Sequence, residues 1–138
     1  MNCPRCGILI APAQHGDLVF DGQVWCQGCH HYDGRLLELR PFPELETWAQ
    51  RICGAFGQEP VYLRHDEAYL PDPAKYWNGA TFLLAEAFHE PREIMLHPPG
   101  HSLMSLCHEL AHIFSGQDHT ENWARVFAVL VAWVKVLL

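Results

Sequence analysis

The stretch from His108 to His112 has the residue types and spacing of a metal site that activates water for hydrolysis. It reads His-Glu-Leu-Ala-His, the HExxH pattern. On a helix, four residues turn about 400°, so His108 and His112 leave from nearly the same side and both imidazoles can reach one ion. Glu109 follows about 100° further round, where its carboxylate would flank the metal without binding it. The pattern predicts zinc-dependent hydrolysis, with Glu109 as the general base.

A helix must carry this motif, and the flanking residues predict one. Ser102 is a suitable N-cap, because its hydroxyl can accept a hydrogen bond from a backbone N–H of the first turn, and Gly116 is a typical stop. Apolar residues recur between them at helical spacing: Leu103, Leu106, Cys107, Leu110, Ala111, Ile113 and Phe114. We therefore expect the motif on a short, mostly buried helix.

A third protein ligand is needed, because catalytic zinc sites hold the metal with three side chains and keep one position open. The candidates beyond the motif are His119, Asp118 and Glu121. We favour His119, with Asp118 as the main alternative because aspartate also binds zinc. Glu121 is expected to act as a cap or surface charge at the start of the next helix. His101, two turns before His108, is a weaker candidate that more simply marks the helix entrance.

Four cysteines at the amino end predict a second, structural zinc site. They form two CxxC pairs: Cys3 with Cys6, and Cys26 with Cys29. Two such pairs are typical of a zinc ribbon, in which four thiolates close a tetrahedral site. The turn residues Asp21-Gly22 between short apolar runs predict a hairpin that brings the pairs together. Disulfides are the alternative, but no secretory segment precedes the cysteines, and CxxC pairs in an intracellular chain more often hold metal.

Length and charge narrow the class of protein. The chain has 138 residues and a formal net charge of −7 with histidines neutral. This length suits one domain core plus a metal-stapled minidomain, since about 40 residues rarely bury enough surface alone. The acidic balance argues against a strong nonspecific grip on nucleic acid, and leaves open a local contact through Arg5, Arg35 or Arg40. The apolar stretch at 124–138 is too short for a membrane span of about 20 residues. We expect a cytoplasmic protein without membrane contact.

The elements that would position the motif follow a simple order. Prolines at 41–43 predict a boundary between a ribbon at residues 1–40 and a second domain at residues 41–138. The second domain is predicted to contain a helix over 44–56 stopped by Gly57, a strand over 61–64, strands over 79–88 and 93–97, the motif helix, and a buried helix over 124–138. Cys53 and Cys107 lie in apolar helical contexts and are expected as small core residues. The order predicts an α+β fold.

These residues together resemble the compact zinc metallopeptidase domains of the SprT-like and WLM type, also called minigluzincins. The similarity covers roughly residues 60 to 138 and is carried by Gly79-Ala80-Thr81-Phe82, Ile94-Met95-Leu96, HELAH, and His119-Thr120-Glu121-Asn122-Trp123-Ala124-Arg125. The resemblance implies a small zincin-like fold in which a third histidine follows HExxH in a segment ending with an aromatic residue, as His119 and Trp123 do. It also implies that an edge strand, expected within Thr81 to Phe88, pairs with an extended peptide. In the family the ribbon more commonly follows the protease domain.

The sequence therefore predicts a zinc metallopeptidase with two zinc ions per chain, one catalytic and one structural, acting on a protein or peptide substrate. Tyr62, Tyr69 or Tyr76 would help to stabilise an oxyanion, and the sequence does not choose among them. Two alternatives remain: a noncatalytic zinc-binding regulatory or interaction module, and a SprT-like protease acting on DNA-bound proteins. The ribbon would contact a protein partner or DNA, or cover the catalytic cleft. The oligomeric state stays open.

Overall fold

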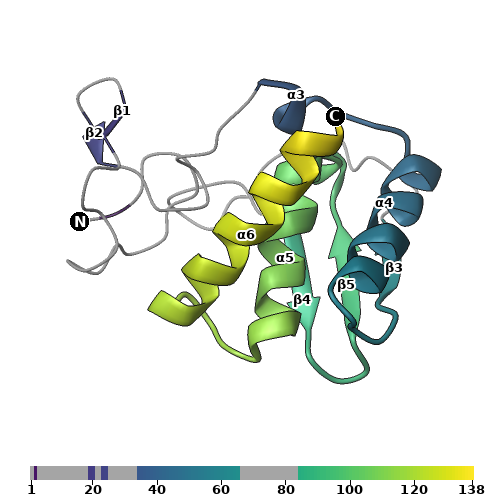
Figure 1. Ribbon diagram of the computed structural model, residues 1–138. Coiled ribbons are helices and arrows are strands. Elements are labelled where there is room, and N and C mark those ends of the chain that lie inside the picture. The colour runs from purple at the N-terminus through teal and green to yellow at the C-terminus, as the bar shows by residue number, and fades with distance from the viewer. Residues whose placement is uncertain (1, 3–18, 21–22, 25–33, 66–83) are drawn as a thin grey trace.

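The computed structural model describes residues 2, 19–20, 23–24, 34–65 and 84–138 (Figure 1). Near the amino end, β1 (Val19–Phe20) pairs antiparallel with β2 (Gln23–Val24), with Val19 opposite Val24. This pairing matches the hairpin predicted there. The remaining described elements are, in order, α3 (Gly34–Leu37), α4 (Phe42–Ala55), β3 (Tyr62–His65), β4 (Ala85–Phe88), β5 (Glu93–Leu96), the 3-10 helix η2 (Pro98–Gly100), α5 (Leu103–Ser115) and α6 (Glu121–Leu137).

A three-stranded sheet has the order β3-β5-β4, with β3 parallel and β4 antiparallel to the central strand β5. Neighbouring residues of a strand point to opposite faces. Leu63 and Ala87 flank Ile94 in one row, and this face is packed against the core. The other face carries Tyr62, which is 63% exposed, and Phe88. The sheet is therefore covered by helices on one side, as Figure 1 shows.

Helix α5 begins and ends at the residues that the sequence predicts. The hydroxyl of Ser102 accepts a hydrogen bond from the backbone N–H of Ser105 at 3.2 Å, which satisfies one free donor of the first turn. Gly116 ends the helix in the left-handed conformation at φ 69°, which a residue without a side chain adopts at no steric cost. Both caps confirm the predicted position of the motif helix.

Helix α5 occupies the centre of the domain. It lies between α6 and the sheet, where β4 packs along it (Figure 1). Leu106, Leu110 and Cys107 of α5 are fully buried, as are Phe127 and Val131 of α6. The same cluster of buried side chains also includes residues of α4 and β5. A rigid core thus surrounds the helix that carries the HExxH motif.

The predicted α+β class is confirmed, and the two unpaired cysteines are core residues as expected. Cys107 is completely buried, and burial raises the pKa of its thiol to about 12. The core also takes in Leu36 of α3, and the backbone N–H of Arg40 donates to the His101 carbonyl at 2.8 Å. Both residues belong to the range that the sequence assigned to the ribbon.

Some element boundaries differ from the expected ones for local reasons. Helix α6 begins at Glu121, the residue expected at its start, and so extends one turn ahead of the apolar stretch at 124–138; the Thr120 hydroxyl accepts a hydrogen bond from the Trp123 backbone N–H and caps it. Helix α4 begins at Phe42 because a proline in its first turn has no N–H to leave unpaired. Of the strand expected over 79–88, residues 79–83 lie outside the described ranges, and the strand begins at Ala85.

Gly100 has no room for a side chain, and its replacement gives the first testable prediction. A Cβ atom there would lie 2.0 Å from the carbonyl oxygen of Leu84, whose position is fixed by a hydrogen bond from the His97 backbone N–H. We expect Gly100→Ala to lower the free energy of unfolding by about 1 to 3 kcal/mol, because the backbone at residue 100 and the backbone at Leu84 would have to move apart. Urea denaturation followed by circular dichroism measures this change.

Gly54→Ala is the matched control for that substitution. Gly54 lies in α4, and a Cβ atom added to it would have nothing within 4 Å, so alanine there should raise stability by up to about 1 kcal/mol. Equal stability of the two variants would show that the contact between Gly100 and Leu84 is not tight.

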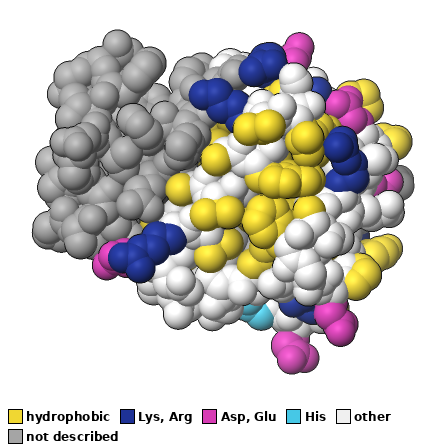
Figure 2. Space-filling view, viewed as in Figure 1, with side chains coloured by type: hydrophobic (Ala, Val, Ile, Leu, Met, Phe, Trp, Pro, Cys, Tyr) yellow, Lys and Arg dark blue, Asp and Glu magenta, His cyan; other side chains and the backbone are white. Residues whose placement is uncertain are grey.

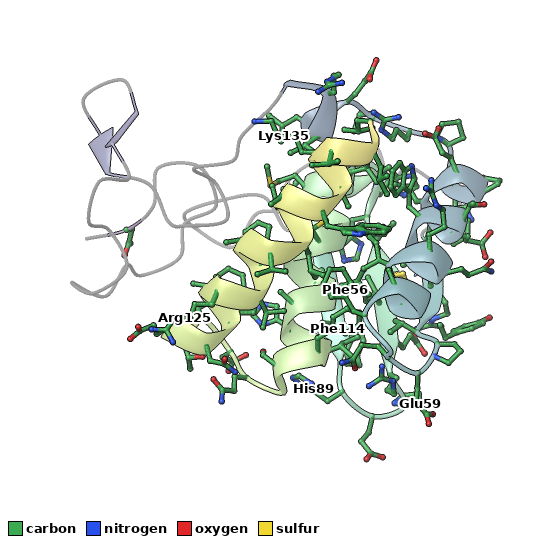
Figure 3. All side chains as sticks on the ribbon, viewed as in Figure 1. Phe56, Glu59, His89, Phe114, Arg125 and Lys135 are labelled. Atoms are coloured by element: carbon green, nitrogen blue, oxygen red, sulfur yellow. The ribbon has the colours of Figure 1, made fainter. Side chains whose placement is uncertain are left out.

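The surface formed by α6 carries several apolar side chains. Val129, Val136 and Leu137 are exposed, and Figure 2 shows hydrophobic side chains gathered on this face. Charged residues stand at the two ends of the helix, Arg125 near its start and Lys135 near its end (Figure 3). Among the helices that the structure describes, none combines the length and the apolar character needed to span a membrane.

Candidate metal centre

Three imidazoles meet at one point between α5 and α6. The Nε2 atom of His112 lies 3.3 Å from Nε2 of His108 and 3.2 Å from Nε2 of His119. The Nε2 atoms of His108 and His119 are also 3.2 Å apart. The three nitrogens therefore form a nearly equilateral triangle. Among the His, Cys, Asp and Glu side chains that the structure describes, these three histidines have ligand atoms close enough together to hold one metal ion.

Two structural features bring the third imidazole to the other two. His108 and His112 are one turn apart on α5, so they share a face of the helix. After α5 ends at Gly116, the chain reverses over residues 117–120 and enters α6 at Glu121. His119 lies in this connection and turns its ring back over α5. Only a few residues connect the two helices, and this short connection places the third nitrogen beside the other two.

The triangle has the dimensions that zinc requires. Ligand nitrogens at 2.0 to 2.1 Å from a tetrahedral zinc are about 3.3 to 3.4 Å from one another. The observed separations of 3.2 and 3.3 Å fit this value closely. Three histidines with one open position are also a donor set of catalytic zinc. The residues present therefore fit the ion that the sequence implies.

The backbone fixes which nitrogen of His112 faces the site. Its Nδ1 lies 2.9 Å from the Gln117 carbonyl oxygen, and a carbonyl only accepts hydrogen bonds, so Nδ1 carries the proton. The Nε2 atom is then left with its lone pair free for a metal. The Gln117 side chain accepts in turn from the Thr120 hydroxyl at 2.5 Å. The loop between the helices thus orients one ligand while it carries another.

The electrostatic surroundings keep the three imidazoles neutral. Burial lowers the pKa of His108 to about 3, and the neighbouring His112 and His119 rings add to the effect. Burial also lowers the pKa of His112 and of His119. A metal binds the neutral form of imidazole. Near neutral pH the folded chain therefore presents three uncharged imidazoles, and a metal does not have to compete with an imidazolium proton.

Glu109 is a buried carboxyl group beside the triangle. The residue is buried, with 7% of its surface exposed, and its Oε1 lies 4.0 Å from Nε2 of His108. Burial, together with the charge of Glu86 on β4, raises the pKa of Glu109 to about 8. Because the pKa of His108 is lowered, this contact is not an ion pair near neutral pH. Glu109 lies close to the nitrogens without belonging to their triangle, as the motif predicts for a base.

The raised pKa of Glu109 makes stability depend on pH with a definite sign. A buried carboxyl with a raised pKa contributes stability that is fully present below its unfolded pKa near 4.5 and is lost as pH rises through about 8. In metal-free protein, we expect the wild type to lose about 1.4 kcal/mol per pH unit relative to Glu109→Gln across this window. Urea midpoints of both proteins from pH 5 to 8 measure the difference.

The comparison with Glu109→Gln isolates this one group, because the histidine titrations are common to both proteins. Their contribution has the opposite sign: it is present above the unfolded histidine pKa near 6.5 and is lost as pH falls. Parallel stability curves for the two proteins would show that the Glu109 pKa is not raised in the fold.

The other candidate residues of the sequence lie apart from the triangle. Asp118 is exposed in the same loop and is not part of the group. The carboxylate of Glu121 pairs with Arg125 at 2.5 Å on the surface. The ring of His101 lies beside those of Phe42 and His65 instead. Tyr62 lies on β3, at the edge of the sheet opposite β4. The remaining candidates fall outside the described residues: Cys3, Cys6, Cys26, Cys29, Tyr69 and Tyr76.

Two contributors to the site were not identified by sequence reasoning. In the sequence, Trp123 is recognised only as the aromatic residue that ends the segment after His119; it is buried, and its ring contacts all three imidazoles. Its place four residues after His119, on the first turn of the next helix, was the available signal. The carbonyl of Gln117 orients His112, and a backbone group leaves no mark in the residue types.

Comparisons of the chain with family models, with curated proteins and with solved structures gave no significant match. The geometry of the chain itself is therefore what supports a function.

Proposed function

We propose that this protein is a zinc-dependent peptidase. The observation that carries the proposal is the triangle of ring nitrogens from His108, His112 and His119 with the buried Glu109 beside it. A hydrolytic zinc site has two parts: three side chains that bind the metal, and a carboxyl group beside the metal that acts as a base. Both parts are present here. A purely structural zinc site has four protein ligands and needs no base.

Each residue has a distinct role in the proposed reaction. The three imidazoles would hold zinc through Nε2. Bound zinc would lower the pKa of water to about 7 and polarise the carbonyl of the substrate. Glu109 takes a proton from the attacking water and delivers it to the nitrogen of the leaving amine. In the metal-free protein burial raises the pKa of Glu109 to about 8, and the charge of a bound zinc ion would favour the carboxylate form that accepts a proton.

The sheet supports a peptide as the substrate. Among the described strands, β4 pairs only with β5, and we propose that its other edge pairs with an extended substrate chain. Helix α5 packs along β4, which places this edge near the helix that carries Glu109. A peptide that pairs with a strand edge is recognised mainly through its backbone, and sequence preference is correspondingly low. We place the substrate along Ala85 to Phe88.

We also propose that a second, structural zinc is held by four cysteines near the amino end: Cys3, Cys6, Cys26 and Cys29.

The experiment that tests the function is cleavage of an unstructured protein and of a mixed peptide library by the zinc-loaded chain. We expect new peptide amino termini, detected by mass spectrometry, and their loss when a chelator removes zinc. Zinc added back should restore cleavage. A chain that holds zinc on the triad and yet cuts neither substrate would overturn the proposal and favour a noncatalytic zinc-binding module.

A further inference from the structure

Trp123 contacts every member of the histidine triangle. Its ring centroid lies 4.8 Å from that of His108, 5.1 Å from that of His112 and 4.8 Å from that of His119. The indole plane is nearly parallel to His112, at 23°, and meets the other two rings at 67° and 71°. No other aromatic side chain of the described residues has a ring contact with all three. Trp123 is also completely buried, so its own position is fixed by packing.

We propose that Trp123 is the positioning residue of the triad, holding the three imidazoles in metal-binding geometry before any ion arrives. The inference rests on the proposed metal site, and not on the peptidase activity. It assigns to Trp123 a role beyond that of a core side chain, because one indole ring packs against two ligands on α5 and against a third in the loop before α6.

Hydrogen bonds hold Trp123 to α5 and to the loop before α6. The indole Nε1–H donates to the carbonyl oxygen of His108 at 3.2 Å, which ties the first turn of α6 to α5. The backbone N–H of the same residue donates to the Thr120 hydroxyl at 3.2 Å, which ties it to the loop beside His119. The ring of Phe127 lies behind, at 5.2 Å from the indole and 5.4 Å from His108. The indole therefore has little freedom to move away.

The ligand that most needs this support is His119. It lies on an exposed loop, whereas His108 and His112 are held by helix α5. An imidazole that is free to change rotamer must lose that freedom when it binds metal, and the loss weakens binding. Packing against Trp123 removes the freedom in advance. Groups that orient metal ligands commonly change metal affinity by about 10- to 100-fold when they are replaced.

Two variants separate the contributions of the ring and its N–H. Trp123→Phe keeps an aromatic ring and loses the donor to the His108 carbonyl, and Trp123→Leu loses the aromatic ring. We expect the dissociation constant of the triad zinc, measured by competition with a chromophoric chelator, to rise about tenfold for Trp123→Phe and about 100-fold for Trp123→Leu. Trp133→Phe and Trp133→Leu are matched controls on the same helix, where Trp133 packs against Phe56 at 5.8 Å. They should stay within about twofold of wild type.

A spectroscopic signature separates positioning from general loss of stability. Cobalt bound in the tetrahedral triad should give an intense visible absorption band in wild type and both Trp133 variants, and a weaker, shifted band in Trp123→Leu. Thermal unfolding of the metal-free proteins shows which variants are folded. If Trp123→Leu does not fold, the Phe variant decides the matter through its zinc affinity alone.

The outcomes distinguish this inference from the site on which it rests. Folded Trp123 variants that bind zinc as tightly as wild type, with an unchanged cobalt band, would overturn it. If His119→Ala binds as much zinc as wild type, His119 is not a ligand, and the triad on which this inference rests is wrong whatever Trp123 does. Neither result depends on whether any peptide is cleaved.

Discussion

Glu109→Gln is expected to keep its fold and its zinc and to lose peptide cleavage by about 10²- to 10⁴-fold, the usual contribution of a general base. The amide has almost the same shape as the carboxyl group, and in the metal-free protein the buried carboxyl is mostly protonated near neutral pH because its pKa is raised to about 8. The fold therefore tolerates a neutral group there. The amide cannot accept the proton of water, so the chemical step fails.

The comparison must be made at equal zinc content, measured by elemental analysis for each protein. Glu121→Gln is the matched control, because it makes the same carboxyl-to-amide change at the start of α6, where Glu121 pairs with Arg125 on the surface. We expect that control to cleave at the wild-type rate. Wild-type turnover by Glu109→Gln would remove the general base from the mechanism, even if the triad still held zinc.

His119→Ala is expected to reduce the zinc content from two ions per chain to about one, whereas Asp118→Ala keeps both. The reason is geometric: Nε2 of His119 lies 3.2 Å from both of the other ring nitrogens, and Asp118 is not in the group. Without the third nitrogen, the two remaining imidazoles hold zinc weakly, while a ribbon with four thiolates keeps its own ion. Elemental analysis of extensively dialysed protein gives the count.

The two neighbouring substitutions control for each other, since both residues are exposed in the same loop. Zinc lost from Asp118→Ala and kept by His119→Ala would make aspartate the ligand. A wild-type chain with one zinc that His119→Ala does not lower would mean that the triad is empty, and the noncatalytic alternative would then be the better description.

The parts of this site that the sequence predicted are those encoded over a few residues. The spacing of His108 and His112 determines a shared helix face, and the caps at Ser102 and Gly116 bound that helix through contacts one turn away. The class of fold followed from the order of such local patterns. His119 was favoured over Asp118 because it fits the pattern of a third histidine just beyond HExxH, and the structure brings its ring nitrogen to the other two.

The parts that the sequence did not reveal depend on packing between distant segments. Leu36 joins the same core as α5 although a proline pair separates α3 from the rest of the domain. The proximity of Glu86 to Glu109 arises from the packing of β4 on α5, which no spacing along the chain encodes. Trp123 could be recognised as buried, but residue type alone does not say which side chains a buried ring touches.

The close spacing of the ligands along the chain has a consequence for the order in which the protein forms. All three ring nitrogens come from residues 108–119, within two consecutive helices and their connection, whereas β3 at 62–65 must find β5 at 93–96 before the sheet exists. Contacts between near neighbours in the chain form sooner than distant strand pairings. We therefore expect α5, α6 and their connection to be able to bind an ion early in folding. The burial of Glu109 and the edge at β4 need the sheet, so we infer that the three ring nitrogens can come together before the rest of the proposed catalytic site is complete.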